Sequence, residues 1–246
     1  MYFLSSTIFE MIYRPVFKRA SAQALKGRLI DPSDPERGRW LKHDVDEFQT
    51  ELWREAKRLL VIADLKKLPT VGSRHNVFLA VLTMAAYRCL LNSGTEPSYA
   101  RSLLSDIGWK VYSWLMLLVY KPMSLTSRKP QKKMNRTLKA LMIFPFSAPG
   151  KPGYEVKSWT EEGRFYTHWT HCPPQQFVRD LIDAQGDRGE LEAFYHSWCL
   201  YDWPAGDLLA GGKRGKHYDR PHTMSKGDSV CDMCWHVDCD SNSLKN

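Results

Sequence analysis

The sequence has no uncharged apolar run long enough to cross a bilayer. The two most apolar stretches are residues 77–91, which Arg88 interrupts, and residues 111–120, which lie between two lysines. Both are shorter than the roughly 20 apolar residues that a membrane-spanning helix requires. The first ten residues have no basic segment and reach Glu10 before any long apolar run, unlike a secretory signal peptide. We therefore expect no membrane partner.

Cysteine is also scarce, with six residues in a chain of 246. This number is far too small for a disulfide-dense secreted scaffold. Hydrophobic residues make up 43% of the chain and charged residues 25%. This composition excludes a disordered chain and allows a sizeable core. We expect a cytoplasmic protein whose thiols are mostly reduced.

Acidic residues are absent between Ile107 and Tyr154, although the chain as a whole contains 27 of them. Within this span, residues 121–139 carry basic side chains together with prolines, serines and threonines. The segment has few aromatic side chains that could stack on bases. We interpret it as a solvated connector or helix face, and nucleic acid is not the expected partner.

The spacing of apolar residues changes along the chain from a helical to a strand pattern. Helices are predicted at 44–62, 75–91, 98–107 and 109–120, followed by a basic connector over 121–140. Strands are predicted at 154–160 and 164–171, helices at 174–184 and 190–201, and strands at 217–224 and 229–237. This order predicts an α+β fold, in which a helical region (1–150) packs on a small antiparallel sheet of β-β-α-α-β-β order (151–240). We expect the two regions to form one compact unit.

The end of the chain contains a cluster of metal-ligating residue types, Cys231, Cys234, His236 and Cys239. A Cys-x-x-Cys pair with a histidine could hold a divalent metal ion if the segment formed a turn. A strand would instead send Cys231 and Cys234 to opposite faces and place Asp232, Cys234 and His236 together. The sequence thus establishes no cofactor and leaves a divalent metal open as the alternative.

Thiol chemistry is the competing interpretation. Cys172 ends a predicted strand and precedes two prolines, so the N-terminus of the next helix would favour a thiolate there. Strand alternation places His168 on the same face as Cys172 and His171 on the other. On the second helix of this region, Cys199 and Asp202 are three residues apart and share a face.

Three segments together carry a resemblance to a known family. They are Gly163-x-Phe165 with His171-Cys172-Pro173, then Phe194 with Cys199-x-x-Asp202, then Arg220-Pro-His222-Thr223 with Gly227 and Cys231-Asp232. In these motifs the chain resembles the L-2-amino-thiazoline-4-carboxylic acid hydrolase family, over most of residues 40–238. It departs from the family pattern at Cys234 and at the Pro221-His222 pair.

The resemblance implies a hydrolase that opens, or in reverse forms, a small cyclic amidine or thiazoline ring by attack at the C=N carbon. The namesake reaction yields an N-carbamoyl-cysteine. The residues implied in catalysis are Cys172 or Cys231 as nucleophile, Asp202 or Asp232 on the amidinium, His222 or His171 in proton transfer, and Cys199 beside them. Arg220 is implied to hold a substrate carboxylate, with His171 and Thr223 as further substrate-binding residues.

An alternative of a different class remains open. The element order is also similar to vinyl-reductase-like ligand-binding domains, in which a sheet and two helices enclose an apolar ligand. In that case the protein would be a sensor module that binds a small molecule or a metal without catalysis. In either case we expect a small-molecule partner, and the sequence leaves a homo-oligomer open.

Overall fold

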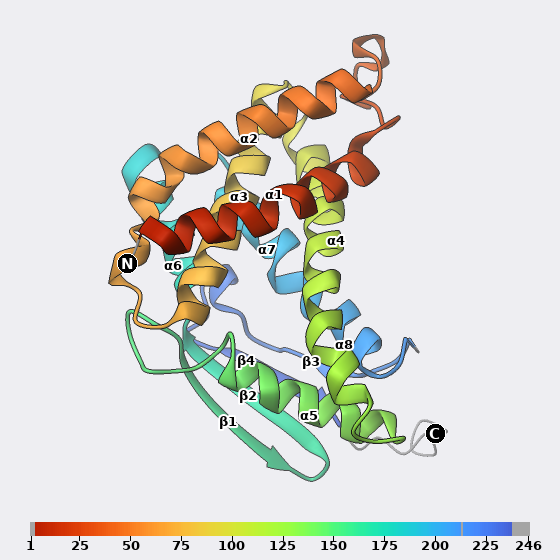
Figure 1. Ribbon diagram of the computed structural model, residues 1–246, viewed down its shortest axis with the longest axis vertical. Coiled ribbons are helices and arrows are strands. Elements are labelled where there is room, and N and C mark those ends of the chain that lie inside the picture. Colours follow the sequence, from red (N-terminus) through yellow and green to blue (C-terminus); the bar gives the residue numbers. More distant parts are fainter. Residues whose placement is uncertain (1–2, 213, 238–246) are drawn as a thin grey trace.

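The computed structural model describes residues 3–212 and 214–237, and Figure 1 shows the arrangement of their elements. The helices are α1 (Phe3–Leu25), α2 (Lys42–Ala63), α3 (Val71–Asn92), α4 (Pro97–Ser124), α5 (Pro130–Ile143), α6 (Pro173–Gln185), α7 (Glu190–Ser197) and α8 (Asp202–Leu209). The strands are β1 (Glu155–Glu161), β2 (Arg164–His171), β3 (Tyr218–Asp219) and β4 (Cys231–His236). The α+β prediction is confirmed, since the helices lie mostly in the N-terminal part and the strands form a small antiparallel sheet. None of the described helices is long and apolar enough to cross a membrane.

Helix α3 is the centre of the helical region, as its apolar residues on nearly every face predict. It begins at a capping box, in which Thr70 accepts a hydrogen bond from the backbone N–H of Ser73. Residues 77–90 of this helix are all buried. The largest core combines α1 to α4 with side chains of α6 and α7, among them Phe177 and Phe194. The helical and sheet-containing regions therefore share one core.

Arg88 carries a charge into this core region, and each nitrogen of its guanidinium group has a partner. Its Nε and Nη2 atoms donate hydrogen bonds of 2.9 and 2.7 Å to Glu190 Oε1, at the start of α7. It also donates to Gln185 and lies 3.5 Å from Glu55. Because Glu190 is 0% exposed, the pair fixes the position of α7 against α3 with both charges out of water.

A series of buried polar contacts, called the polar string below, connects α1 with the segment before the sheet. Tyr13 lies 2.5 Å from His75 Nε2, and His75 Nδ1 lies 2.9 Å from Asn76 Oδ1. The amide of Asn76 donates a 2.7 Å hydrogen bond to the hydroxyl of Tyr154. Burial lowers the pKa of His75, so the ring is neutral at pH 7 and can donate on one side and accept on the other.

The sheet has the order β1-β2-β4-β3, with every neighbouring pair antiparallel. In the central pair, Phe165 lies opposite Trp235 and Trp169 opposite Cys231. These residues are buried and form the inner face of the sheet. Helix α5 packs over this face through Met134, Leu138 and Leu141, and Figure 1 shows it lying across the strands.

Two predicted helices, 98–107 and 109–120, are in fact one continuous helix, α4. The two predicted ranges leave out only Gly108, which lies between them. In the structure Gly108 allows a close approach, because a Cβ atom there would lie 2.3 Å from the hydroxyl of Tyr201. That hydroxyl donates a 2.7 Å hydrogen bond to the carbonyl of Ser105 on the same helix.

The predicted connector at 121–140 is also largely helical, so of the two interpretations a helix face describes it better than a connector. Helix α5 begins at Pro130, where a proline fits because the first helical N–H has no partner within the helix. Three of its basic residues, Lys132, Arg136 and Lys139, are exposed, and Lys133 is half-buried.

The C-terminal part differs most from the prediction. Helix 190–201 ends at Ser197, and an unpredicted helix, α8, includes Pro204 in its first turn, where proline is tolerated. Strand 217–224 shrinks to Tyr218–Asp219, because Pro221 has no N–H and the next N–H groups bond to side chains. The N–H of Thr223 donates to Asp228, and that of Met224 donates to the sulfur of Cys231.

The Arg88 cluster gives a stability prediction. Arg88→Leu leaves Glu190 as a buried charge without its cation, so we expect it to lower the free energy of unfolding by about 3–5 kcal/mol. Arg58→Leu is the matched control, because Arg58 pairs with the same Glu55 but is exposed. Urea denaturation should show a change below about 1 kcal/mol for the control. Equal losses in both variants would contradict the assignment.

Candidate functional site

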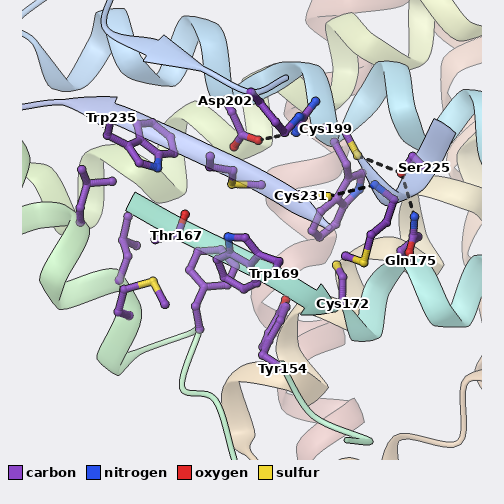
Figure 2. Close-up of a pocket in the computed structure, with 18 of the residues that line it drawn as sticks. Tyr154, Thr167, Trp169, Cys172, Gln175, Cys199, Asp202, Ser225, Cys231 and Trp235 are labelled. Atoms are coloured by element: carbon purple, nitrogen blue, oxygen red, sulfur yellow. Dashed lines mark hydrogen bonds and ion pairs between the residues drawn. The ribbon is translucent and has the colours of Figure 1, made fainter. Parts of the chain in front are cut away.

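A cavity of about 120 Å³ lies between the inner face of the sheet and the surrounding helices. Figure 2 shows its walls, which are mostly aromatic rings and methionine side chains. The aromatic residues that line it are Tyr112, Phe146, Tyr154, Phe165, Trp169, Phe194, Trp198 and Trp235. Its size is similar to the cavity of about 150 Å³ that binds benzene in an engineered protein. The cavity therefore suits a molecule of about one ring.

Three thiols from different parts of the chain line this cavity. Cys172 lies at the junction of β2 and α6, Cys199 follows α7, and Cys231 begins β4. Burial raises the pKa of all three, and a charge on Cys231 would raise the pKa of Cys172 and of Cys199 further. The thiols are consequently protonated at neutral pH.

Hydrogen bonds hold two of these thiols in place. The sulfur of Cys199 lies 3.2 Å from the hydroxyl of Ser225, which accepts a 3.1 Å hydrogen bond from the amide of Gln175 (Figure 2). The sulfur of Cys231 accepts from the N–H of Met224 at 3.2 Å. These donors act against the desolvation of a thiolate, yet burial remains the largest influence on the pKa of both cysteines.

An ion pair between Arg220 and Asp202 is the charged part of the cavity wall. The Nη1 atom of Arg220 donates to Asp202 Oδ2 at 3.1 Å, and the hydroxyl of Tyr218 donates to the same oxygen at 3.1 Å. The guanidinium also lies over the ring of Trp203 at 4.8 Å. Burial raises the pKa of Asp202 to about 6, although Arg220 and Tyr218 act to lower it. Asp202 is thus a carboxylate at pH 7 that can take up a proton at little cost.

Several buried polar atoms around the cavity have no partner among the described residues. They are Nε and Nη2 of Arg220, Oγ1 of Thr167 and Nε1 of Trp169. The side chain of Arg220 is only 1% exposed. Buried donors are nearly always hydrogen-bonded in proteins, and an arginine with two such donors matches a carboxylate or carbonyl oxygen. The unpaired atoms therefore indicate a polar ligand group at this end of the cavity.

The structure brings together five of the residues that the sequence singled out, namely Cys172, Cys199, Cys231, Asp202 and Arg220. It does not bring the others into the cavity wall. Asp232 and His222 pair with each other at 2.7 Å, outside the cavity lining. The physical reason is strand alternation, since Cys231 points inward and Asp232 therefore points outward.

The two remaining substrate-binding candidates also lie behind or beside the cavity. The ring of His171 is held by the carbonyl of Gly153 at 2.6 Å. Thr223 is buried, and its hydroxyl lies 3.5 Å from the sulfur of Cys231. Thr223 thus contacts a residue of the wall without lining the cavity itself.

The prediction that Cys172 shares a face with His168 is wrong. Cys172 lines the cavity together with Thr167 and Trp169, whereas His168 packs against Trp159, with ring centroids 4.6 Å apart. Strand β2 ends at His171, so Cys172 no longer follows the alternation. The predicted thiolate is also contradicted, because desolvation by burial outweighs the nearby helix N-terminus and raises the pKa of Cys172.

The alternative metal site is not assembled in the described part of the chain. Cys231 and Met233 line the cavity, so Cys234 and His236 lie on the opposite face, as strand alternation predicts. His236 Nε2 lies 2.6 Å from Asp219. Cys239 falls outside the described residues. Within 3–212 and 214–237, no three His, Cys, Asp or Glu side chains are placed to hold a metal ion.

The sequence analysis missed several lining residues. Gln175 and Ser225 position Cys199, and Thr167 and Trp169 carry unpaired polar atoms. The alternation of β2 could have found the latter two, because both face inward with Phe165. No local signal marks Gln175 and Ser225, since their contact joins segments 50 residues apart.

Asp202 gives a prediction on pH dependence. Its pKa is raised from 3.8 to about 6, so the folded chain keeps this proton between those values while the unfolded chain releases it. The resulting stabilisation is fully present below pH 4 and is lost as the pH rises through 6. From pH 4 to 7, the wild type should lose about 2–3 kcal/mol of unfolding free energy relative to Asp202→Asn.

Urea denaturation at a series of pH values measures this difference. Asp232→Asn is the matched control, because hydrogen bonds and the charge of His222 lower the pKa of Asp232. Its stabilisation is present at neutral pH and lost on acidification, so the control difference has the opposite sign. A flat difference for Asp202→Asn would contradict the raised pKa.

The thiols give a second prediction. We expect iodoacetamide at pH 7 to alkylate Cys172, Cys199 and Cys231 at least about tenfold more slowly in the folded chain than in urea, because only the thiolate reacts. Mass spectrometry of each cysteine-containing peptide measures the rates. Rapid alkylation of any of the three in the folded chain would indicate a thiolate and reinstate a thiol nucleophile.

The chain was compared with family models, curated proteins and solved structures. No family model, no curated protein and no solved structure matches the chain. The site is therefore interpreted from its own geometry.

Proposed function

We propose that the protein is a hydrolase that binds a single-ring small molecule in this cavity and opens it, with a cyclic amidine or thiazoline as the substrate class. The observation that carries the proposal is the Arg220–Asp202 pair at the cavity wall. Arg220 uses one nitrogen for Asp202 and has two buried N–H donors without a partner among the described residues. Asp202, with a pKa raised to about 6, combines a carboxylate at pH 7 with ready protonation.

The attacking group in this proposal is water. The thiols are unsuited to attack because burial raises their pKa, as it does for Cys172 and Cys231. Asp202 takes a proton from water while the water oxygen bonds to the amidine carbon. The C=N electron pair moves onto the ring nitrogen, which carries the proton of the cationic amidine. In an aminothiazoline, the bond from that carbon to the ring sulfur then breaks while the new hydroxyl releases its proton to solvent and becomes the carbonyl. Asp202 returns the proton it took to the sulfur. One water is consumed, and the product is a carbamoyl-substituted thiol.

The remaining side chains bind and orient the ring. The free donors of Arg220 suit a carboxylate on the substrate, in a bidentate geometry. The aromatic walls and the neutral thiols surround the apolar part of the ring and exclude bulk water. Exclusion of water strengthens the electrostatic effect of Asp202 on the cationic amidine.

A test uses 2-amino-2-thiazoline-4-carboxylate as the probe, with gain of one water followed by mass spectrometry. We expect Asp202→Asn to lower kcat by roughly 10²–10⁴-fold, the usual range for loss of a general base. The matched variant Asp232→Asn removes the neighbouring carboxylate outside the cavity and should leave kcat unchanged. Arg220→Gln should raise KM for this probe but not for 2-amino-2-thiazoline, which has no carboxylate.

The nucleophile is tested separately. Cys231→Ser should retain more than about a tenth of kcat, because water attack does not use the thiol. Complete loss of turnover in this variant, with folding intact, would contradict water attack and favour the thiol.

The second candidate is a ligand-binding module without catalysis. It is favoured by one observation, that all three thiols in the cavity are protonated and none is poised for attack. Isothermal titration with the same two thiazolines distinguishes the candidates. Saturable binding without any turnover would overturn the hydrolase and support the binding module.

A further inference from the structure

The outward sides of α4 and α5 form a surface that the cavity does not use. We define it as the α4–α5 outer surface, made of Trp114, Leu118, Lys121, Leu125, Lys129, Lys132, Arg136, Lys139 and Ile143, all exposed. The members that lie within each helix recur every three or four positions, so they share one face of that helix. Leu125 is the C-cap of α4, and Lys129 is the N-cap of α5. The opposite faces carry Met116, Leu138 and Leu141, which line the cavity. Each helix therefore has one face that lines the cavity and an opposite face that is exposed to solvent.

The charge of this surface has one sign. No acidic residue occurs between Ile107 and Tyr154, and eight basic residues lie between Lys110 and Lys139. The net charge of the whole chain is +8, so the positive charge of this segment equals the excess of basic over acidic residues in the whole chain. A local excess of this size attracts an anionic partner.

Large apolar side chains are exposed within the basic surface. Leu118 is 53% exposed, Leu125 is 88% exposed and Ile143 is 76% exposed, and Trp114 lies on the same face of α4. An ordinary solvated helix face carries polar residues at such positions. Leucine and tryptophan between lysines are instead typical of helices that lie in the interface of a membrane.

The α4 part and the α5 part of this surface are connected by a hydrogen bond near the turn between the two helices. Arg136 on α5 donates a 2.5 Å hydrogen bond to the carbonyl of Thr126, just after α4. This contact connects α5 to the backbone one residue after Leu125. Figure 1 shows this bend at the lower edge of the molecule, away from α1 and α2.

The occurrence of basic and exposed apolar side chains on one surface favours a lipid bilayer over a nucleic acid as the partner. A nucleic acid would use the lysines and arginines but would leave exposed leucine and isoleucine in water. A bilayer surface with anionic headgroups suits both kinds of side chain. Each basic side chain near it strengthens binding by about fivefold, and the apolar side chains enter the headgroup region.

We propose that the α4–α5 outer surface docks on an anionic lipid bilayer. The expectation of no membrane partner rested on the lack of a spanning helix, and peripheral docking requires none. The cavity then lies directly behind the docked helices, since their inner faces form part of its wall.

The test is co-sedimentation of the full chain with vesicles of phosphatidylcholine alone or with roughly 30% phosphatidylserine, at low and at high salt. We expect binding only to the vesicles that contain phosphatidylserine, weakened by salt. Lys132→Glu/Lys139→Glu should lower the partition coefficient by roughly 30-fold or more. Leu125→Glu should lower it by roughly tenfold, because it removes a side chain from the interface.

Matched controls use the same changes elsewhere on the helical region. Lys57→Glu/Lys66→Glu reverses two exposed lysines, and Val61→Glu alters a valine that is 80% exposed. Both controls should bind as the wild type does. The proposal is overturned by equal binding to neutral vesicles or by wild-type binding of the α4–α5 variants. It is also overturned if a DNA duplex, rather than the vesicles, binds in a salt-dependent way.

Discussion

The position of the candidate site depends on the buried ion pair between Arg88 and Glu190. Helix α3 is apolar on nearly all sides, so most of its contacts come from the hydrophobic effect, which has no preferred direction. The pair has directional hydrogen bonds, and it connects the first residue of α7 to the C-terminal part of α3. Cys199 and Asp202 follow α7 within a few residues, so their placement at the cavity derives from this contact.

Regular local patterns could be predicted from the sequence. The alternation of residues in β4 gives its inward side chains, Cys231, Met233 and Trp235, and correctly separates Cys231 from Cys234. The spacing in α2 and the apolar character of α3 likewise give helices close to those observed. In each case one face is buried along the whole element, so the period of the pattern is visible in the sequence.

The parts that could not be predicted depend on contacts between distant segments. Gly108 separates two predicted helices, and only the fold places Tyr201 against it. Cys172 follows the pattern of a residue activated by a helix N-terminus, until the fold places it in the cavity wall, where desolvation raises the pKa of its thiol. Asp202 and Asp232 are both candidates in the sequence motifs, and the sequence does not distinguish them. In the fold, the side chain of Asp202 lines the cavity and that of Asp232 does not. Burial and electrostatics are properties of the assembled fold, so they decide which members of a motif can act.

The polar string from Tyr13 to Tyr154 makes the first helix part of the cavity's support. Tyr154 lines the cavity, and its hydroxyl is held by Asn76, which in turn contacts His75 and through it Tyr13. A shortened chain that began after α1 would leave His75 without its phenol partner and would uncover Phe78, which packs against Phe9. The N-terminal helix therefore supports the cavity, because the ring of Tyr154 in the cavity wall is connected to it through Asn76 and His75.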